Sequence, residues 1–248
     1  MSMSLSKTTT KRKDTKFLQL IKEVETRKDF PMLWNTMYTL KENKEIDSNV
    51  MTFYGHNFDK LGVKASFSNF FIHEEVPFTI PEVCWNQMEQ KLQSEGDSQL
   101  PPRTVLISFS EKSIMLCKAA VMGDIATYRQ ILNADCPALC KVLGRRVSPF
   151  DERLWQKVIL EVAFEVVYQK FLGFRESVES KKFHDFLIQT GNSLIAEAAP
   201  RDKIWGIGKG AKNPQCADCR SWGEGNVLGF ALMKARDTML AESEWELL

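Results

Sequence analysis

The chain has 248 residues, of which 44% are hydrophobic and 26% are charged, and its 33 basic residues nearly balance 32 acidic ones. This length and composition fit a soluble globular protein with one large domain, or one domain with an appendage. The net charge of +1 excludes recruitment of nucleic acid or an anionic membrane by the field of the whole molecule, so any polyanion site has to be local. No apolar run approaches the ~18 residues of a membrane-spanning helix, and the first residues lack a secretory signal.

The amino-terminal residues predict a tail and an appendage. Residues 1–15 are rich in Ser, Thr and Lys, which is typical of a disordered basic tail. A solvated tail is the commoner meaning of such a run, and a localisation signal or a nucleic-acid arm is the alternative. Apolar spacing predicts helices at 17–27 and 32–42. We therefore expect an intracellular, cytoplasmic protein, with the nucleus as an alternative, divided into tail and appendage (1–50), main domain (51–241) and carboxyl-terminal tail (242–248).

The main domain begins with short extended segments. Residues 51–56 and 67–73 are aromatic-rich and predict short strands around a loop at 57–66. Residues 74–103 combine a predicted helix at 81–93 with the polar run SEGDSQLPPR, and we interpret them as a surface excursion. An extended run follows at 104–110.

The remainder of the chain is mostly helical. Periodicity and capping residues predict helices from 110, at 124–133, 137–143, 151–171 and 174–190, a strand at 194–199, and a helix from 226 to about 241. The pattern predicts a single, helix-dominated α+β domain whose few short strands frame a cleft.

The six cysteines do not form a familiar metal pattern. Cys216 and Cys219 make a CxxC pair, and Cys136 and Cys140 a CxxxC pair in a helical context. A zinc site needs four ligands, and the second CxxC is missing. A four-cysteine site is conceivable, but reduced thiols, with one pair in a surface loop and one semi-buried, are favoured. We therefore expect no metal.

Residues 200–210, PRDKIWGIGKG, combine features that a packed core does not need together. Glycines at Gly206, Gly208 and Gly210 allow a close backbone approach. Trp205 places a flat apolar surface among them, on which a ring-shaped ligand could stack. A glycine-rich turn with its Trp packed into the core is the alternative.

Six phrases in chain order resemble the NADAR family, also called YbiA-like. They are FYGHNFDKLGVKASFSNFF (53–71), SFSEKSIMLCKAA (108–120), ILNADCPALCKVLGRRV (131–147), FDERLWQKVILEVAFEVVYQKF (150–171), LIQTGNSLIAEAAPRDKIWGIGKG (187–210) and WGEGNVLGFALMKARDTM (222–239). The resemblance covers about 51–241, with an insertion or divergent piece near 74–103. It implies a YbiA-like α+β fold.

The resemblance also implies an N-glycosidase that needs no cofactor. Members of the family hydrolyse ribosylamino-pyrimidine intermediates of riboflavin synthesis or remove ADP-ribose from guanine in nucleic acid. The expected partner is thus a small phosphoribosyl or ADP-ribosyl substrate, or modified nucleic acid. A module that binds ADP-ribose or a nucleotide without cleaving it is the alternative; a purely structural protein would leave Glu111, Asp202 and Trp205 unexplained.

The matching motifs assign roles to residues. Glu111 would act as acid/base or water activator, Asp202 as second carboxylate and Trp205 as stacking wall. Lys118, seven residues after Glu111 and on the same helix face, could instead attack an opened sugar as a Schiff-base amine. Without the family, Glu111 would be a first-turn acid favoured by the helix dipole.

Two positions depart from the family pattern, and several others are secondary candidates. Lys112 stands where His is usual and Met115 where Gln is usual, which bears on substrate choice and activity. The substrate-binding candidates are Asn69 at a polar ring or ribose edge, Gly206 and Gly208, the phosphate-binding pair Arg145 and Arg146, and Asn226 as the N-cap of an anion-receiving helix. The alternatives are an Asx-turn for Asn69 and an exposed basic helix end for the arginines.

Overall fold

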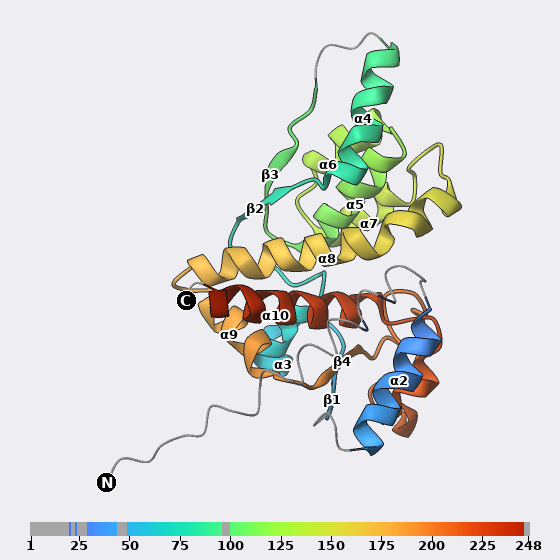
Figure 1. Cartoon of the computed structure of the whole chain (residues 1–248). Helices are drawn as coiled ribbons and strands as arrows, with labels where there is room; N and C mark the ends of the chain where they lie inside the picture. The colour runs from blue at the N-terminus through green and yellow to red at the C-terminus, as the bar shows by residue number, and fades with distance from the viewer. Residues whose placement is uncertain (1–19, 21–22, 24–28, 44–48, 96–99, 246–248) are drawn as a thin grey trace. The chain divides into compact units, whose positions relative to one another are not determined.

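The computed structural model describes residues 20, 23, 29–43, 49–95 and 100–245 (Figure 1). It divides into two compact units: unit 1 joins Met1–Tyr54 to Thr190–Leu248, and unit 2 is Gly55–Gln189. Helices dominate and the strands are few and short, which confirms the helix-dominated α+β class. The predicted tail at 1–15 and most of the predicted helix at 17–27 lie outside the described residues.

Unit 1 is built on two parallel strands. Its elements are α2 (Phe30–Glu42), β1 (Val50–Phe53), β4 (Leu194–Glu197), the 3-10 turns η2 (Pro214–Ala217) and η3 (Cys219–Trp222), and α10 (Val227–Trp245). Val50 pairs with Leu194 and Phe53 with Glu197. A parallel pair needs a crossover connection, and here the whole of unit 2 lies within that connection.

Aromatic side chains join the appendage to the rest of unit 1. Trp34 of α2 is fully buried, and its ring lies 5.0 Å from that of Trp222 in η3. Phe30 contacts Phe230 of α10 edge-on, with ring centroids 5.5 Å apart. The predicted helix at 32–42 is thus confirmed and starts at Phe30. The predicted carboxyl-terminal tail overlaps α10, which runs to Trp245.

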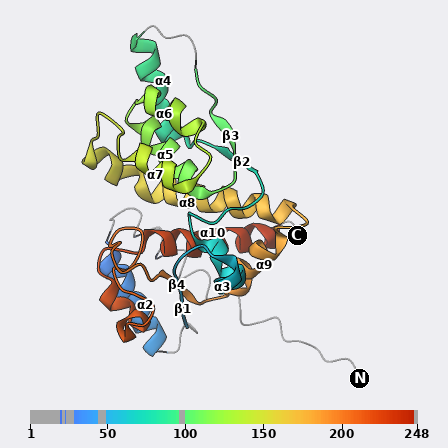
Figure 2. The ribbon, with the colours of Figure 1, turned by 180° about the vertical axis from the view of Figure 1, so that it is seen from behind.

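Unit 2 surrounds one central helix. Its elements are α3 (Phe58–Leu61), η1 (Gly62–Phe67), β2 (Val76–Thr79), α4 (Glu82–Glu95), β3 (Thr104–Ile107), α5 (Ser110–Val121), α6 (Ile125–Leu132), α7 (Pro137–Gly144), α8 (Glu152–Glu176) and α9 (Lys181–Gln189). Helix α5 packs against α4, α6, α7 and α8, and Figures 1 and 2 show these helices gathered around it. Helix α5 therefore occupies the middle of the unit.

Side-chain caps start the helices around α5. The Asp151 carboxylate accepts hydrogen bonds from the amides of Arg153 and Leu154 at the start of α8. Asp124 caps α6 in the same way and also accepts from the amide of Ser148, which ties that loop to the helix start. These caps satisfy amides that have no partner inside the helix.

Four predictions about unit 2 are wrong. Residues 67–73 form no strand, and the predicted loop at 57–66 is mostly α3 and η1. The predicted surface excursion is instead packed: β2 pairs with β3 in antiparallel fashion, and α4 buries Cys84, Met88 and Leu92. Helix α8 continues to Glu176, so the last helix of unit 2 starts later than predicted. Tertiary burial of aromatic residues produced the false strand signal.

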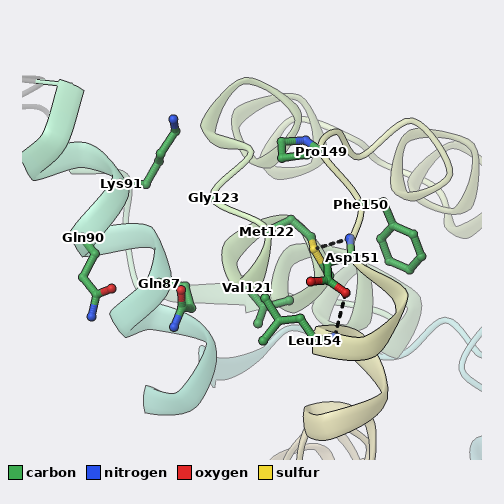
Figure 3. Close-up of a pocket in the computed structure, with 10 residues that line it drawn as sticks. All are labelled: Gln87, Gln90, Lys91, Val121, Met122, Gly123, Pro149, Phe150, Asp151 and Leu154. Carbon is green, nitrogen blue, oxygen red and sulfur yellow. Dashed lines mark hydrogen bonds between the residues drawn. The ribbon is translucent and has the colours of Figure 1, made fainter.

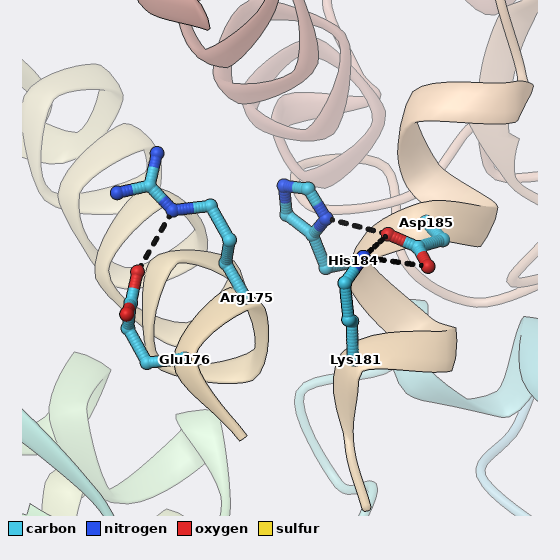
Figure 4. A network of polar contacts seen from close by, with 5 residues as sticks. All are labelled: Arg175, Glu176, Lys181, His184 and Asp185. Carbon is cyan, nitrogen blue, oxygen red and sulfur yellow. Dashed lines mark hydrogen bonds and ion pairs between the residues drawn. The ribbon is translucent and has the colours of Figure 1, made fainter. Parts of the chain in front are cut away.

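The end of α8 and the start of α9 carry exposed charges (Figure 4). Arg175 pairs with Glu176 at 2.9 Å, and Lys181 and His184 both donate to the Asp185 carboxylate. The hydrogen bond from Lys181 is the main reason why the pKa of Asp185 is lowered. Exposed pairs of this kind contribute little to stability. Among the described helices, none has the length and apolar character needed to cross a membrane.

Candidate functional site

Glu111 lies at the second position of α5, in the middle of unit 2, and its side chain is only 5% exposed. Among the described residues, no side chain caps this helix. Instead the Glu111 amide donates a 2.9 Å hydrogen bond to the carbonyl of Asn69. The helix start predicted at Ser110 and Glu111 is confirmed. The helix dipole favours a carboxylate at this end, so the fold can accommodate the charge in a nearly buried place.

The two residues that depart from the family pattern are both engaged with α7 or the loop before it. The Lys112 ammonium donates to the carbonyl of Ala134 at 3.1 Å. Met115 lies so close to Gly144 that a Cβ atom on that glycine would lie 1.8 Å from the methionine sulfur. Both side chains therefore have a packing or hydrogen-bonding role in this chain.

Lys118 lies on the same face of α5 as Glu111, two turns further along. Its ammonium donates to the Gly144 carbonyl at 2.8 Å and stands 4.3 Å from the centre of the Phe150 ring. Burial, together with the positive charge of Arg145, lowers the pKa of Lys118, and the carboxylate of Glu152 opposes that effect. A lowered pKa increases the fraction of neutral, nucleophilic amine.

Phe150 also lines an open pocket of about 410 Å³ in unit 2 (Figure 3). The pocket lies between α4, the end of α5 and the start of α8. Its lining residues are Gln87, Gln90, Lys91, Val121, Met122, Gly123, Pro149, Phe150, Asp151 and Leu154. The amide and amino groups come from α4, and the apolar floor from α5 and α8. Sequence patterns did not predict this pocket, because residues 74–103, which include its α4 side, are typical of a surface excursion.

Buried polar groups near the start of α5 were also missed. The hydroxyls of Ser110 and Ser113 and Nε2 of His73 are buried and have no hydrogen-bond partner among the described residues. His73 Nδ1 contacts the Glu74 carbonyl at 2.6 Å, which makes Nδ1 the protonated nitrogen. Burial, aided by the charge of Lys170, lowers the pKa of His73 to about 3, so the ring is neutral.

The second predicted half of the site is the loop around Trp205 in unit 1. Asp202 Oδ1 accepts hydrogen bonds from the amides of Ile204 and Trp205, at 3.0 and 2.8 Å. The Asp202 carbonyl accepts from the amide of Gly208, which has a φ of +66° that favours glycine. The Trp205 side chain is half-buried. The loop is thus a compact turn that fixes both Asp202 and Trp205.

The close backbone approach predicted at Gly206 is an approach to another part of the same chain, the end of β4. A Cβ atom there would lie 2.8 Å from Ala199 and from the Glu197 carbonyl. The residue is buried against the end of β4, where only glycine leaves room for the strand, so packing by itself accounts for this glycine. A ligand contact at Gly206 stays a prediction.

Asn226 is also corrected. It is fully buried, and its side-chain amide donates to the Ile195 carbonyl and accepts from the Glu197 amide. The first amides of α10, at Asn226, Val227 and Leu228, donate to the carbonyls of residues 206, 204 and 205. The side chain therefore does not cap the helix, and these amides are already used, so this helix start is not an anion site.

The remaining candidates are dispersed. Arg145 and Arg146 are exposed at the end of α7, and Arg145 lies near Lys118.

The cysteines differ from the prediction of a thiol pair in a surface loop. Cys216 and Cys219 are buried, and burial raises the pKa of the Cys219 thiol to about 11. Within the described ranges, no group of three or more His, Cys, Asp or Glu residues is placed to hold a metal ion.

The structure thus brings some predicted residues together. Glu111 is bonded to Asn69 through the backbone, and Lys118 lies beside Arg145, all in unit 2. Asp202 and Trp205 share one turn in unit 1. The meeting of these two half-sites in one cleft stays a prediction.

Comparisons with known proteins identify the family of the chain and a similar fold. Residues 52–240 match the family model of the NADAR domain. The chain is 35% identical over 130 residues to N-glycosidase R617 of Acanthamoeba polyphaga mimivirus, covering 52% of this chain and 72% of that protein. It is 30% identical over 152 residues to protein irg-1 of Caenorhabditis elegans, covering 60% and 69%. The fold is similar to the NMR structure of YbiA from E. coli, with a TM-score of 0.51, 19% identity, and coverage of 79% of this chain and 88% of that one. The chain belongs to the NADAR family.

Proposed function

We propose that the protein is an N-glycosidase that hydrolyses the bond between a base and the ribose of a phosphoribosyl or ADP-ribosyl group. The observation that carries the proposal is Glu111, a nearly buried carboxylate at the start of a central helix, with Lys118 on the same helix face. The likeness to a viral protein named N-glycosidase supports the class of reaction.

The chemistry follows from what an N-glycosidic bond needs in order to break. As the bond to the base breaks, positive charge develops on the sugar, which a nearby carboxylate stabilises. Glu111 would also take a proton from the attacking water, and the leaving base takes up a proton as it departs. Asp202 would be the second carboxylate, and the exposed part of Trp205 would stack on the base.

A second mechanism uses the same helix face. With its lowered pKa, the Lys118 amine could attack C1 of the ring-opened sugar, where the base is still held as an imine, and displace the base as a free amine. Water would then hydrolyse the Schiff base between Lys118 and the sugar, which releases the sugar as an aldehyde and restores the amine. The two mechanisms differ in one respect that can be measured: only the second forms a covalent bond between protein and sugar.

The test offers purified protein two substrates, a phosphoribosylamino-pyrimidine and a DNA oligonucleotide that carries ADP-ribosylated guanine. Mass spectrometry should detect the released base from at least one of them. Parallel reactions with sodium borohydride would trap a sugar on the peptide that contains Lys118 if a Schiff base forms. Lys157→Arg on the exposed side of α8 is a matched control for Lys118→Arg.

Binding without release of base from either substrate would overturn the proposal. That outcome would favour the non-hydrolytic binding module. The substitutions at Lys112 and Met115, which engage both side chains in local contacts, would then explain the loss of hydrolysis.

A further inference from the structure

The strongest unexplained feature of unit 2 is a lysine inside its core. Lys170 of α8 is 2% exposed and lies on the apolar face of the helix, four residues after Val166 and eight after Val162. No ion pair links it to another described residue. Burial lowers its pKa to about 7, which shows that the site disfavours the charge. For packing alone, an apolar side chain would serve better at this position.

The contacts of Lys170 show what the amino group does. Nζ donates to the carbonyl of Ser66 at 2.7 Å and to that of Ser68 at 3.2 Å. The rings of Phe71, Phe171 and Phe174 surround it, with centroids 5.6–5.9 Å away. The amino group is thus an enclosed donor for two carbonyls that lie outside any strand or α-helix, of which that of Ser68 also accepts from the Phe71 amide.

The segment that Lys170 holds leads directly to Glu111. Ser66, Ser68 and Asn69 are all buried, and the next carbonyl in the segment, that of Asn69, receives the Glu111 amide. Lys170 therefore fixes residues 66–68, these place the Asn69 carbonyl, and that carbonyl fixes the first turn of α5. Since α5 has no side-chain cap, this chain of contacts takes the place of one.

We propose that Lys170 is a positioning residue of the candidate site: it anchors residues 66–69 and thereby holds the backbone of Glu111 in place. The inference rests on the proposed function only in taking Glu111 as the acting carboxylate. Lys170 itself, enclosed by the three phenylalanine rings, does not contact the substrate.

The test measures amide hydrogen exchange in Lys170→Met, which keeps the apolar shape and removes the donor. The probes are the amides of Ser68, Phe71 and Glu111, which donate to carbonyls of residues 65, 68 and 69. Their exchange should rise by about tenfold or more, while the Tyr128 amide in α6 changes far less. Lys157→Met, on the exposed side of the same helix, should leave all four unchanged.

A packing control separates positioning from general loss of stability. Val166→Ala destabilises α8 without touching the carbonyls. Exchange that rises equally at all probes in Lys170→Met and Val166→Ala, or no rise at all, overturns the inference. Lys170→Leu, which also removes the donor, supplies the same comparison if Lys170→Met does not fold.

Steady-state kinetics add a second readout. Lys170→Met should lower kcat about tenfold or more with KM within about twofold, because the acting group is displaced while the binding surface remains. The exchange measurement needs no substrate. If Lys170→Met shows the altered exchange but the wild-type protein cleaves no N-glycoside, only the proposed function is overturned. If the wild-type protein is active but Lys170→Met exchanges like the wild type, only the role of Lys170 is overturned.

Discussion

The two predicted half-sites are held in place by different kinds of interaction. Around Glu111 in unit 2, the structure uses buried ionisable groups. Lys170 is enclosed by aromatic rings, and His73 is neutral, with one ring nitrogen that has no partner in the part of the chain that the structure describes. Around Trp205 in unit 1, it uses backbone amides, the Asp202 carboxylate and the neutral side chain of Asn226. Titration should therefore affect the first half-site far more than the second.

The largest expected effect tests which half-site contains the reacting group. Glu111→Gln keeps the shape of the side chain but removes its ability to exchange a proton, so turnover should fall by about 10²-fold or more while ligand still binds. Turnover and affinity are measured together. Glu82→Gln is the matched control, since Glu82 is an exposed acid in the first turn of α4. Unchanged turnover in Glu111→Gln would remove this residue from the mechanism.

The next effect tests the hydrogen bonds by which the Asn226 side chain holds β4 in unit 1. Asn226→Gly removes two buried hydrogen bonds to β4 without adding backbone strain, because Asn226 has a φ of +81°. The free energy of unfolding, measured in urea, should fall by about 2 kcal/mol. Asn213→Gly removes a single hydrogen bond in the same unit, an exposed one to the Gln215 amide, so it should lower the free energy of unfolding by less. Equal losses in the two variants would show that the buried amide is not the main support.

Substitutions at Trp205 distinguish an indole that stacks on the ligand from one that packs in the core. Because its indole is half-buried, Trp205→Ala should weaken ligand binding by at least about 1 kcal/mol while the melting temperature changes little. Trp205→Phe should restore part of the affinity. A collapse of the melting temperature, with affinity intact in the remaining folded protein, would instead make Trp205 a core residue.

The smallest effect tests the difference in titration directly. His73 has an ordinary pKa of 6.5 when unfolded and about 3 when folded, mainly because it is buried. As the pH falls below 6.5, the unfolded chain takes up a proton that the folded protein does not, so stability decreases. Between pH 6.5 and 5.5 this should cost the wild type about 1 kcal/mol more than His73→Asn, which keeps a donor in the place of Nδ1. Parallel pH dependences in the two proteins would contradict the neutral, buried histidine.

The fold was predictable wherever periodicity reflects burial. Helix α5 and most of α8 follow from their apolar spacing, and the starts of α6 and α8 follow from Asp124 and Asp151. Residues 67–73 misled the prediction because Phe67 and Phe71 pack on other aromatic rings without strand pairing. Local pattern cannot report contacts with residues more than a hundred positions away.

The candidate site was predictable only in part. Glycines in 200–210 correctly marked a tight approach, but a glycine pattern does not say what approaches, and at Gly206 it is β4. Lys170 was overlooked because an amphipathic pattern treats one lysine in a long helix as part of its exposed face. The role of Glu111 came from family resemblance, since its position alone is typical of any helix start.

The pairing of β1 with β4 has a consequence for synthesis on the ribosome. The two strands that build unit 1 are separated by all of unit 2, so β1 emerges about 140 residues before its partner. Unit 2 is continuous and can fold as soon as it has emerged. Until Leu194–Glu197 is made, the edge of β1 has no partner strand, and the apolar face of α2 stays uncovered for longer, until Trp222 and Phe230 have been made.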